Sequence, residues 1–306
     1  MKKHFVFLVY LFSIIFLLKP LPIFATEGHN EILMPDAQLF NSEDRSAIEE
    51  LTPDIIEFAN LFQDENIEAS ESDIDFSKTY CVYTDVDVFD KLPITRQKVE
   101  ELTTAAKKVW AVPVYSNGKT VIVQVSKGLK LNERSQMNLT PDEIEEIKTK
   151  EGKWQVVAST CYDHIIDIEK KLQEIYDSNN ISDKKLECIF FGGVPGIQSI
   201  IGVLLEEDVA IGVTSLQKDF VVENNSQTKG KEKNITISKD KVYTVEEFAE
   251  NTKILRTIDN NVQDSTSGLF ISKEQKWTNT GYFIGGGFII LVVFILAWKR
   301  LKHKRL

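Results

Sequence analysis

VWAVPVYSNGKTVIVQV, residues 109–125, is the stretch that decides the fold of this chain. Two runs rich in valine, 109–115 and 120–125, flank the turn sequence SNGK. Apolar β-branched residues favour strands, and an Asn-Gly pair supplies the positive φ angles that a tight hairpin turn requires. The sequence therefore predicts an antiparallel hairpin near the middle of the chain.

Strands and helices are predicted on both sides of this hairpin. The period-two alternation that starts at Tyr80 and runs to Val88 predicts a strand, and 97–108 predicts a short helix. The stretch 163–179 has an apolar stripe at helical spacing and predicts a long amphipathic helix with Asp163 as its N-cap. Further strands are predicted at 153–160, 186–191, 200–205, 209–215 and 234–238, and further helical turns after Thr140 and Thr244.

The order of these elements predicts the fold class. Consecutive strands joined by short turns pair antiparallel, and one long amphipathic helix can cover one face of a sheet. The predicted fold is therefore an α+β domain over 77–258, with an antiparallel sheet and the long helix packed on a face. The preceding region, 26–76, is acidic and predicts a helix near Thr52-Pro53 followed by a linker at 63–75, which leaves open a stalk or a helix packed on the core.

The C-terminal end predicts a membrane anchor. Residues 281–298 contain no charge, and about 18–20 apolar residues cross the hydrocarbon core of a bilayer. The basic residues of 299–306 follow directly, and such clusters stay in the cytoplasm. The sequence predicts a tether at 259–280, a transmembrane helix at 281–298 and a basic cytoplasmic tail. Gly281 and Gly285 match a small-xxx-small pattern, which predicts pairing of this helix with another in the membrane.

The N-terminal end predicts export. Lys2 and Lys3 precede an apolar run at 5–18, which is short for a membrane span and typical of a signal peptide. Ala25 is the expected last residue before cleavage, so 1–25 is the predicted signal peptide. Uncleaved, this segment would be a second anchor. Together the two ends predict a single-pass type I membrane protein with its main part outside the cell.

A short motif beside the anchor resembles a sorting signal. Trp277-Thr278-Asn279-Thr280-Gly281 lies just before the apolar segment and the basic tail. This resembles the signal of Gram-positive proteins that sortases attach to the cell wall, which reads Leu-Pro-x-Thr-Gly. Thr280 and Gly281 match, whereas Trp277 and Thr278 replace the Leu and Pro. The resemblance covers the last 30 residues and implies a bacterial surface location.

The charge of the exported part disfavours nucleic acid as a partner. Setting aside the eight cations at the two ends leaves 28 Lys and Arg against 46 Asp and Glu, a net charge of −18. Affinity for nucleic acid depends on cations that neutralise phosphates. Three cysteines, Cys81, Cys161 and Cys188, exclude a dense disulfide scaffold, and they predict buried thiols or at most one disulfide, for which Cys161 and Cys188 are candidates.

Two sets of residues are candidate binding sites. Asp85 and Asp87 are predicted to project from one face of a strand end, where paired carboxylates suit a cation or acid–base chemistry. Phe190, Phe191 and Val194 flank a glycine-rich turn and would form a binding tip if that turn were exposed. A Cys161-Tyr162-Asp163-His164 cluster has chemical variety, but thiol nucleophiles usually receive their histidine from a distant segment. We expect no catalytic residue, metal or cofactor.

These observations predict a function of the binding class. The first hypothesis is a bacterial surface protein with a non-catalytic ectodomain that binds a protein, a peptide or a cell-wall component. The second is an exported hydrolase that uses carboxylates such as Asp85 and Asp87. The third is an accessory sensor that couples to a membrane partner through helix pairing.

Overall fold

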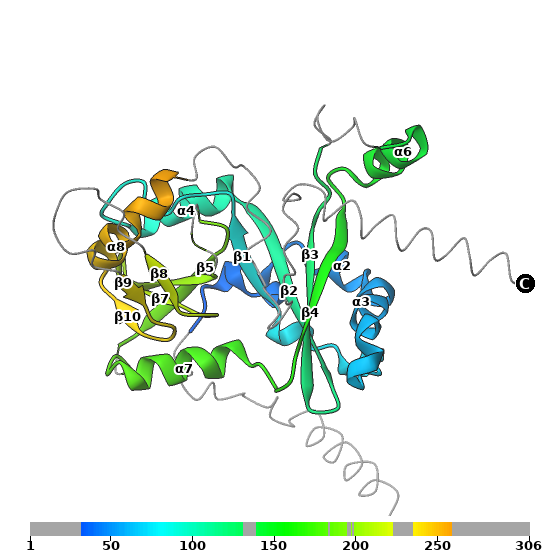
Figure 1. Ribbon diagram of the computed structural model, residues 1–306, viewed down its shortest axis with the longest axis horizontal. Coiled ribbons are helices and arrows are strands. Elements are labelled where there is room, and N and C mark those ends of the chain that lie inside the picture. The colour runs from blue at the N-terminus through cyan, green and yellow to red at the C-terminus, as the bar shows by residue number, and fades with distance from the viewer. Residues whose placement is uncertain are drawn as a thin grey trace, which may run out of the picture. The chain divides into compact units, whose positions relative to one another are not determined.

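The described part of the chain is built around a single large sheet. The computed structural model describes residues 32–130, 139–182, 184–194, 197, 199–222 and 235–258. Among these, eight strands form one sheet in the order β10-β7-β6-β5-β1-β2-β3-β4, and β8 pairs separately with β9 (Figure 1). The strands are β1 (Tyr80–Thr84), β2 (Lys107–Ser116), β3 (Lys119–Lys127), β4 (Trp154–Tyr162), β5 (Leu186–Phe191), β6 (Ile201–Glu206), β7 (Val209–Ser215), β8 (Phe220–Val222), β9 (Ile235–Ile237) and β10 (Val242–Tyr243).

The sheet joins two antiparallel meanders at a parallel junction. Neighbouring strands are antiparallel in β1-β2-β3-β4 and in β5-β6-β7-β10. β1 and β5 run parallel, with Val82 opposite Phe190 and Tyr83 opposite Phe191. Every residue of β1 is buried, so this strand is covered on both faces. The fold is therefore α+β with a mostly antiparallel sheet, and this class is the predicted one.

The central hairpin has the predicted turn. β2 and β3 pair from Val109 opposite Ser126 to Ser116 opposite Lys119. Asn117 has a φ of 51° and Gly118 a φ of 77°, which are the positive values that a two-residue hairpin turn uses.

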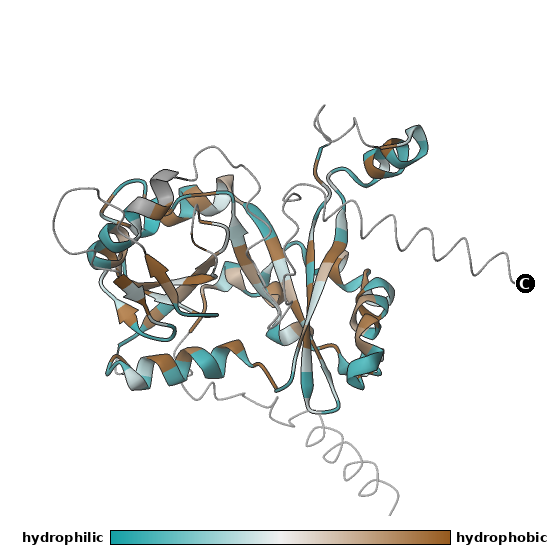
Figure 2. Cartoon of the chain, viewed as in Figure 1, coloured by the Kyte–Doolittle hydropathy of each residue, from teal (hydrophilic) through white to brown (hydrophobic). Residues whose placement is uncertain are grey.

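Several helices, rather than one, accompany the sheet. Hydrophobic residues concentrate in the strands, and hydrophilic residues in the helices and turns (Figure 2). The α-helices are α2 (Arg45–Glu49), α3 (Thr52–Ala59), α4 (Arg96–Ala105), α6 (Pro141–Lys150), α7 (Ile168–Ser178) and α8 (Val245–Ile258). The 3-10 helices are η1 (Pro35–Ala37), η2 (Leu39–Asn41), η3 (Asn60–Glu65), η4 (Glu71–Asp73) and η5 (Phe76–Lys78).

The acidic N-terminal region packs on the core. Ile48, Ile55 and Ile67 are fully buried and belong to the same hydrophobic cluster as the strands. Asp44, at the start of α2, accepts a hydrogen bond from Trp110 Nε1 of β2 at 3.3 Å. The alternative of a helix packed on the core therefore holds for this region. Ile74 forms an isolated β-bridge with β2, so the stretch 63–75, predicted as a linker, lies against the sheet.

The amphipathic helix begins later than its sequence pattern predicts. α7 starts at Ile168, and Asp167 is its N-cap, whose side chain accepts from Glu169 N and Lys170 N at 3.1 Å. The prediction that Asp163 caps it is wrong because the preceding turn is tied to the sheet. There, Thr120 Oγ1 accepts a hydrogen bond from Ile166 N at 2.8 Å. α7 buries its apolar side, which consists of Ile168, Leu172, Ile175 and Tyr176.

The predicted membrane segments lie outside the described residues. These are the signal peptide 1–25, the tether 259–280, the span 281–298 with Gly281 and Gly285, and the tail 299–306. Within the part of the chain that the structure describes, no helix has the length and apolar character needed to cross a bilayer.

Candidate functional site

The loop 85–95 between β1 and α4 carries the candidate site. Three of its residues, Val88, Phe89 and Ile94, are at most 4% exposed and fix the loop to the core. The ring of Phe89 stacks on that of Phe248 from α8, with centroids 5.2 Å apart. Buried apolar residues thus hold this loop in place, and its polar residues are left near the surface.

Asp87 stabilises the conformation of this loop through hydrogen bonds to its backbone. Its Oδ1 accepts a hydrogen bond from Phe89 N at 2.9 Å, and its carbonyl oxygen accepts one from Asp90 N at 3.2 Å. A carboxylate that bonds the backbone two residues further on stabilises a turn. Asp87 is therefore a structural residue of this loop as well as a residue of its surface.

Lys98 ties the loop to α4. The hydroxyl of Thr95 caps this helix by accepting from Lys98 N at 3.2 Å. The Lys98 ammonium donates to the carbonyl oxygens of Val88, at 3.4 Å, and of Lys91. Partial burial lowers the pKa of Lys98, and the nearby carboxylates of Asp90 and Asp87 oppose this shift. The loop thus encloses a cation that is largely engaged by backbone carbonyls.

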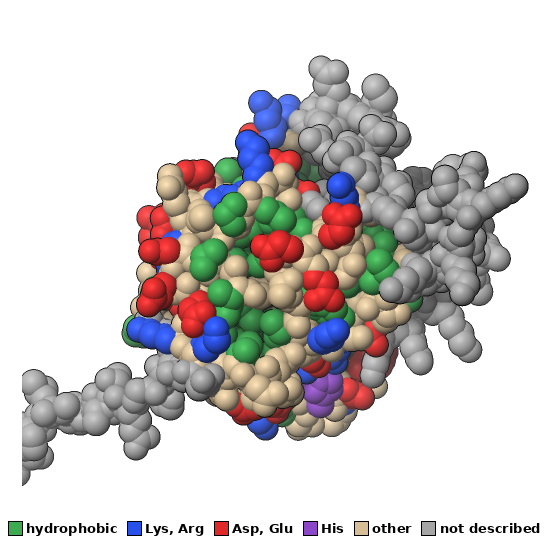
Figure 3. All heavy atoms as spheres, turned by 90° about the vertical axis from the view of Figure 1, so that its left-hand side faces the viewer, with side chains coloured by type: hydrophobic (Ala, Val, Ile, Leu, Met, Phe, Trp, Pro, Cys, Tyr) green, Lys and Arg blue, Asp and Glu red, His purple; other side chains and the backbone are tan. Residues whose placement is uncertain are grey.

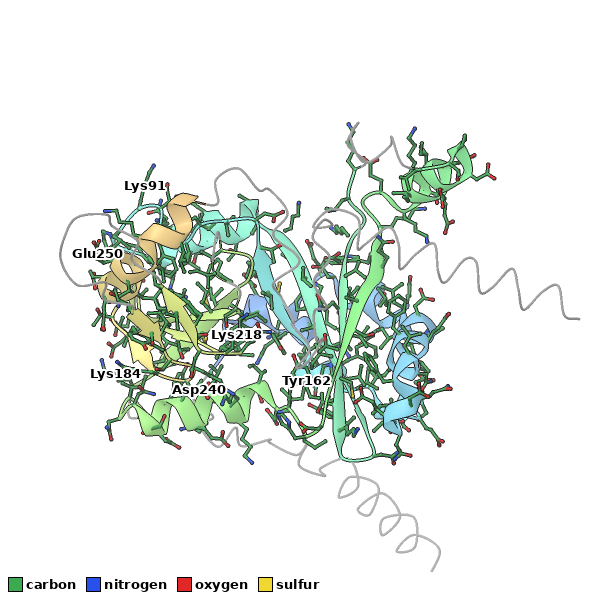
Figure 4. The ribbon with its side chains drawn as sticks, viewed as in Figure 1. Lys91, Tyr162, Lys184, Lys218, Asp240 and Glu250 are labelled. Carbon is green, nitrogen blue, oxygen red and sulfur yellow. The ribbon has the colours of Figure 1, made fainter. Side chains whose placement is uncertain are left out.

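An open cavity of about 680 Å³ lies between this loop and α4. Its lining combines carboxylates, ammonium groups, neutral polar groups and a few apolar side chains. Figure 4 shows Lys91 on the loop, at the outer side of the molecule near α8. The lining residues are Val86, Asp87, Asp90, Lys91, Pro93, Thr95, Gln97, Lys98, Glu101 and Leu102. Such a mixture suits a polar ligand that carries charges of both signs.

Asp85 does not join Asp87 at this cavity. β1 ends at Thr84, so the strand alternation that would place both carboxylates on one face does not reach them. Asp85 has a positive φ of 65° and forms an ion pair with Lys107 at the start of β2. Of the two predicted carboxylates, the structure places only Asp87 in the cavity wall.

The predicted binding tip is buried. Phe190 and Phe191 belong to β5 and are 0% exposed, and Val194 is 1% exposed. Phe190 packs edge-on against Tyr80, with ring centroids 5.2 Å apart. The exposure that a binding tip requires is therefore missing, because these side chains belong to the core where β1 and β5 meet.

The three thiols are free and have raised pKa values. Burial raises the pKa of Cys81 to about 12, and burial raises that of Cys188 further. Burial and the neighbouring Glu65 carboxylate raise the pKa of Cys161 to about 11. A thiol with such a pKa is a poor nucleophile at neutral pH.

His164 pairs with its sequence neighbour. Its Nδ1 lies 2.8 Å from Asp163 Oδ1, and both side chains are more than half exposed. Cys161 Sγ contacts the carbonyl of Tyr162 instead, at 3.9 Å. Within the described ranges, no group of three or more His, Cys, Asp or Glu side chains is arranged to hold a metal ion.

Sequence reasoning missed the role of Lys98. The available signal was Thr95, a typical N-cap residue three positions before it, which would have placed Lys98 in the first turn of α4 beside the acidic loop.

Comparisons of the chain with protein-family models, with curated proteins and with solved structures found no match.

Proposed function

We propose that this protein is a single-pass bacterial surface protein whose exported domain binds a protein, a peptide or a cell-wall component without catalysis. The two ends of the sequence support the location: a signal peptide at 1–25, a transmembrane helix at 281–298 and a basic tail. The exported domain would therefore act through what it binds outside the cell.

The cavity between α4 and the loop 85–95 is the observation that carries the binding function. Ligand sites are concave and combine apolar walls with a few placed polar groups. Here the loop 85–95 is fixed to the core by its buried side chains, and a rigid loop loses little conformational entropy on binding. Lys98 and Asp87 already hold the loop together, so they fit the role of a preformed wall better than that of a proton-transfer pair.

The charges of the cavity favour a zwitterionic ligand. Asp90 and Glu101 can accept from an amine, and Lys91 can pair with a carboxylate. Short peptides and the peptide stems of wall polymers carry both groups. The face of the molecule in Figure 3 shows many acidic side chains among hydrophobic ones, which agrees with the net charge of −18 for the predicted exported part and disfavours polyanionic ligands.

A pair of matched tryptophan variants tests this proposal. Gln97 lines the cavity and donates to Glu101 Oε1, four residues further along α4, at 3.0 Å. Gln173 repeats this arrangement on α7, where it donates to Asp177 Oδ1 at 2.9 Å. Calorimetry of the full-length protein in detergent micelles, with a panel of short peptides and muropeptides, measures the affinity. We expect Gln97→Trp to abolish binding and Gln173→Trp to leave it unchanged.

Two outcomes would contradict the proposal. One is equal binding by both variants, which would place the ligand elsewhere. The other is the detection by mass spectrometry of cleavage products from the same panel. Such turnover would favour the alternative of an exported hydrolase. A sensor that signals through Gly281 and Gly285 would instead require a change in a membrane partner when those residues are enlarged.

A further inference from the structure

The two edges of the large sheet are protected very differently. At one end, β10 has only two residues, and the neighbouring edge of β7 is covered by the loop 85–95, where Ala210 N donates to Ile94 O at 2.9 Å. At the other end lies β4, with nine residues. Proteins usually shorten, charge or cover edge strands, because an exposed edge pairs readily with another chain.

In the part of the chain that the structure describes, β4 has no neighbouring strand on its outer side. Among the residues that the structure describes, β4 forms its ladder with β3, and no backbone group of 155–161 has a hydrogen-bond partner in an element other than β3. A β-bulge leaves Val157 without an opposite residue, since Val156 and Ala158 pair with the consecutive residues Val125 and Gln124. After the bulge, 158–162 runs as a regular strand whose alternate N–H and C=O groups point outward.

The side chains of β4 add no charge that would repel a partner. From Trp154 to Tyr162 the strand reads WQVVASTCY, without Lys, Arg, Asp or Glu. All of these side chains except Thr160 are partly exposed. Neither of the common edge defences, an inward-pointing charge or a proline, is present in this strand. Within the sequence of β4 itself, the bulge is the feature that hinders pairing, and it lies before the regular stretch.

An acidic wall runs alongside this edge. α3 lies beside β4 (Figure 1), where Ser159 Oγ donates to Phe58 O at 3.1 Å. Further along, Glu65 at the end of η3 lies beside Cys161 and pairs with Lys119 at 3.6 Å. The stretch 52–65, which forms α3 and η3, contains four acids and no Lys or Arg: Asp54, Glu57, Asp64 and Glu65, all exposed.

We propose that the outer edge of β4 binds an extended basic segment of another polypeptide by strand addition. The backbone of 158–162 would supply the ladder hydrogen bonds, as in other cases where a peptide extends a sheet. The acids of α3 and η3 would pair with Lys or Arg in the added segment, which is the charge complementarity that selects it. This surface is separate from the cavity at loop 85–95, so the two can be tested independently.

Hydrogen exchange on the full-length protein in detergent micelles tests the backbone part of this proposal. The probe is a synthetic peptide with an alternating Thr-Val core flanked by lysines. We expect it to slow the exchange of amides in 158–162. The same peptide with every second backbone amide methylated should bind too weakly to protect them, because it cannot form the ladder.

Charge reversal tests the selection of a basic partner. The double variant Asp54→Lys with Glu57→Lys on α3 should weaken binding of the lysine-flanked peptide about tenfold. It removes two exposed ion pairs with the peptide and replaces them by repulsion between lysines. The matched control is Asp142→Lys with Glu145→Lys on α6, which has the same spacing on exposed helix positions. That control should leave the affinity unchanged.

Four results would overturn the proposal. The first is protection of amides elsewhere but not in 158–162. The second is equal binding by a glutamate-flanked peptide, which would remove the role of the acidic wall. The third is protection of 158–162 in the protein alone together with a dimer in sedimentation, because a second copy would then occupy the edge. Loss of binding after Gln97→Trp would also contradict it, since that variant alters only the cavity.

Discussion

Replacing Phe89 by alanine should release the loop that forms one wall of the cavity. Phe89 is 4% exposed, so its ring buries most of roughly 200 Å² of apolar surface, which at about 25 cal/mol per Å² gives an upper bound near 5 kcal/mol. Phe→Ala changes in cores cost about 3–5 kcal/mol. We therefore expect the free energy of unfolding to fall by about 4 kcal/mol.

The stacking of Phe89 on Phe248 adds a second, sharper expectation. Ring pairs of this kind contribute about 0.5–1.5 kcal/mol beyond their buried area. In a double-mutant cycle, Phe89→Ala and Phe248→Ala together should cost about 1 kcal/mol less than the sum of the single changes. Urea unfolding of the full-length protein in detergent micelles, followed by the fluorescence of the buried Trp110, measures all four free energies.

Phe40 provides the control for this cycle. It is 64% exposed, and the guanidinium of Arg45 lies 4.8 Å from its ring centroid. Phe40→Ala should cost less than about 1 kcal/mol. A cost for Phe89→Ala no larger than that for Phe40→Ala would refute the burial of the loop. Strict additivity of Phe89→Ala and Phe248→Ala would refute the contact between loop and α8.

Three further predictions concern the turn, the sheet and the thiols. Gly118→Ala should lower the free energy of unfolding by about 1 kcal/mol in the same urea assay, because alanine disfavours the positive φ; an unchanged midpoint would contradict this turn. Gly202→Ala places a Cβ 2.9 Å from Cys188 Sγ and should cost about 1–3 kcal/mol, partly restored by Cys188→Ala; no rescue would contradict the crowding. With its pKa at about 11, the Cys161 thiol stays protonated at pH 9 and should be alkylated slowly at that pH. Glu65→Gln removes a charge that raises this pKa, so the rate of alkylation, measured by mass spectrometry, should increase. An alkylation rate in the unmutated protein equal to that of a free thiol would contradict the raised pKa.

The hairpin could be predicted from sequence because its signals are local. The Asn-Gly pair, the flanking β-branched residues and the alternation all lie within one short window, and the structure follows them. The parallel junction of β1 and β5 could not be predicted in the same way. Its pairs join Val82 to Phe190 across most of the domain, and no local pattern encodes which distant strand will lie alongside.

Helix ends show how tertiary contacts override local signals. Asp163 and Asp167 are equally good N-cap residues, and the apolar stripe of α7 begins near both. The hydroxyl of Thr120 accepts a hydrogen bond from Ile166 N, which ties this residue to the sheet, so the helix starts after the later aspartate. Similarly, the acidic composition around Ile67 predicts a linker, whereas buried Ile67 and the pairing of Ile74 with Val114 of β2 keep this stretch on the core.

The candidate site was predicted only in part. The carboxylate of Asp87 does line the cavity, since polar residues at a strand end tend to lie at the surface. Asp85 and Asp87 were expected together, but a positive φ at Asp85 turns the chain, and the ion pair with Lys107 takes that carboxylate elsewhere. Phe190 and Phe191 lie in a strand, as predicted, but their burial removes the binding tip, because apolar residues beside glycines look alike in a buried strand and in an exposed tip.

The parallel junction between β1 and β5 also governs how the chain can mature. β1 leaves the ribosome roughly a hundred residues before its neighbour β5, so in a nascent chain this strand, which the complete fold buries, has one side open. A chain truncated before Leu186 would keep that side of β1 open, and partly folded chains with open strand edges aggregate readily. The first half of the molecule therefore lacks one neighbour of its buried strand until the second half has been made.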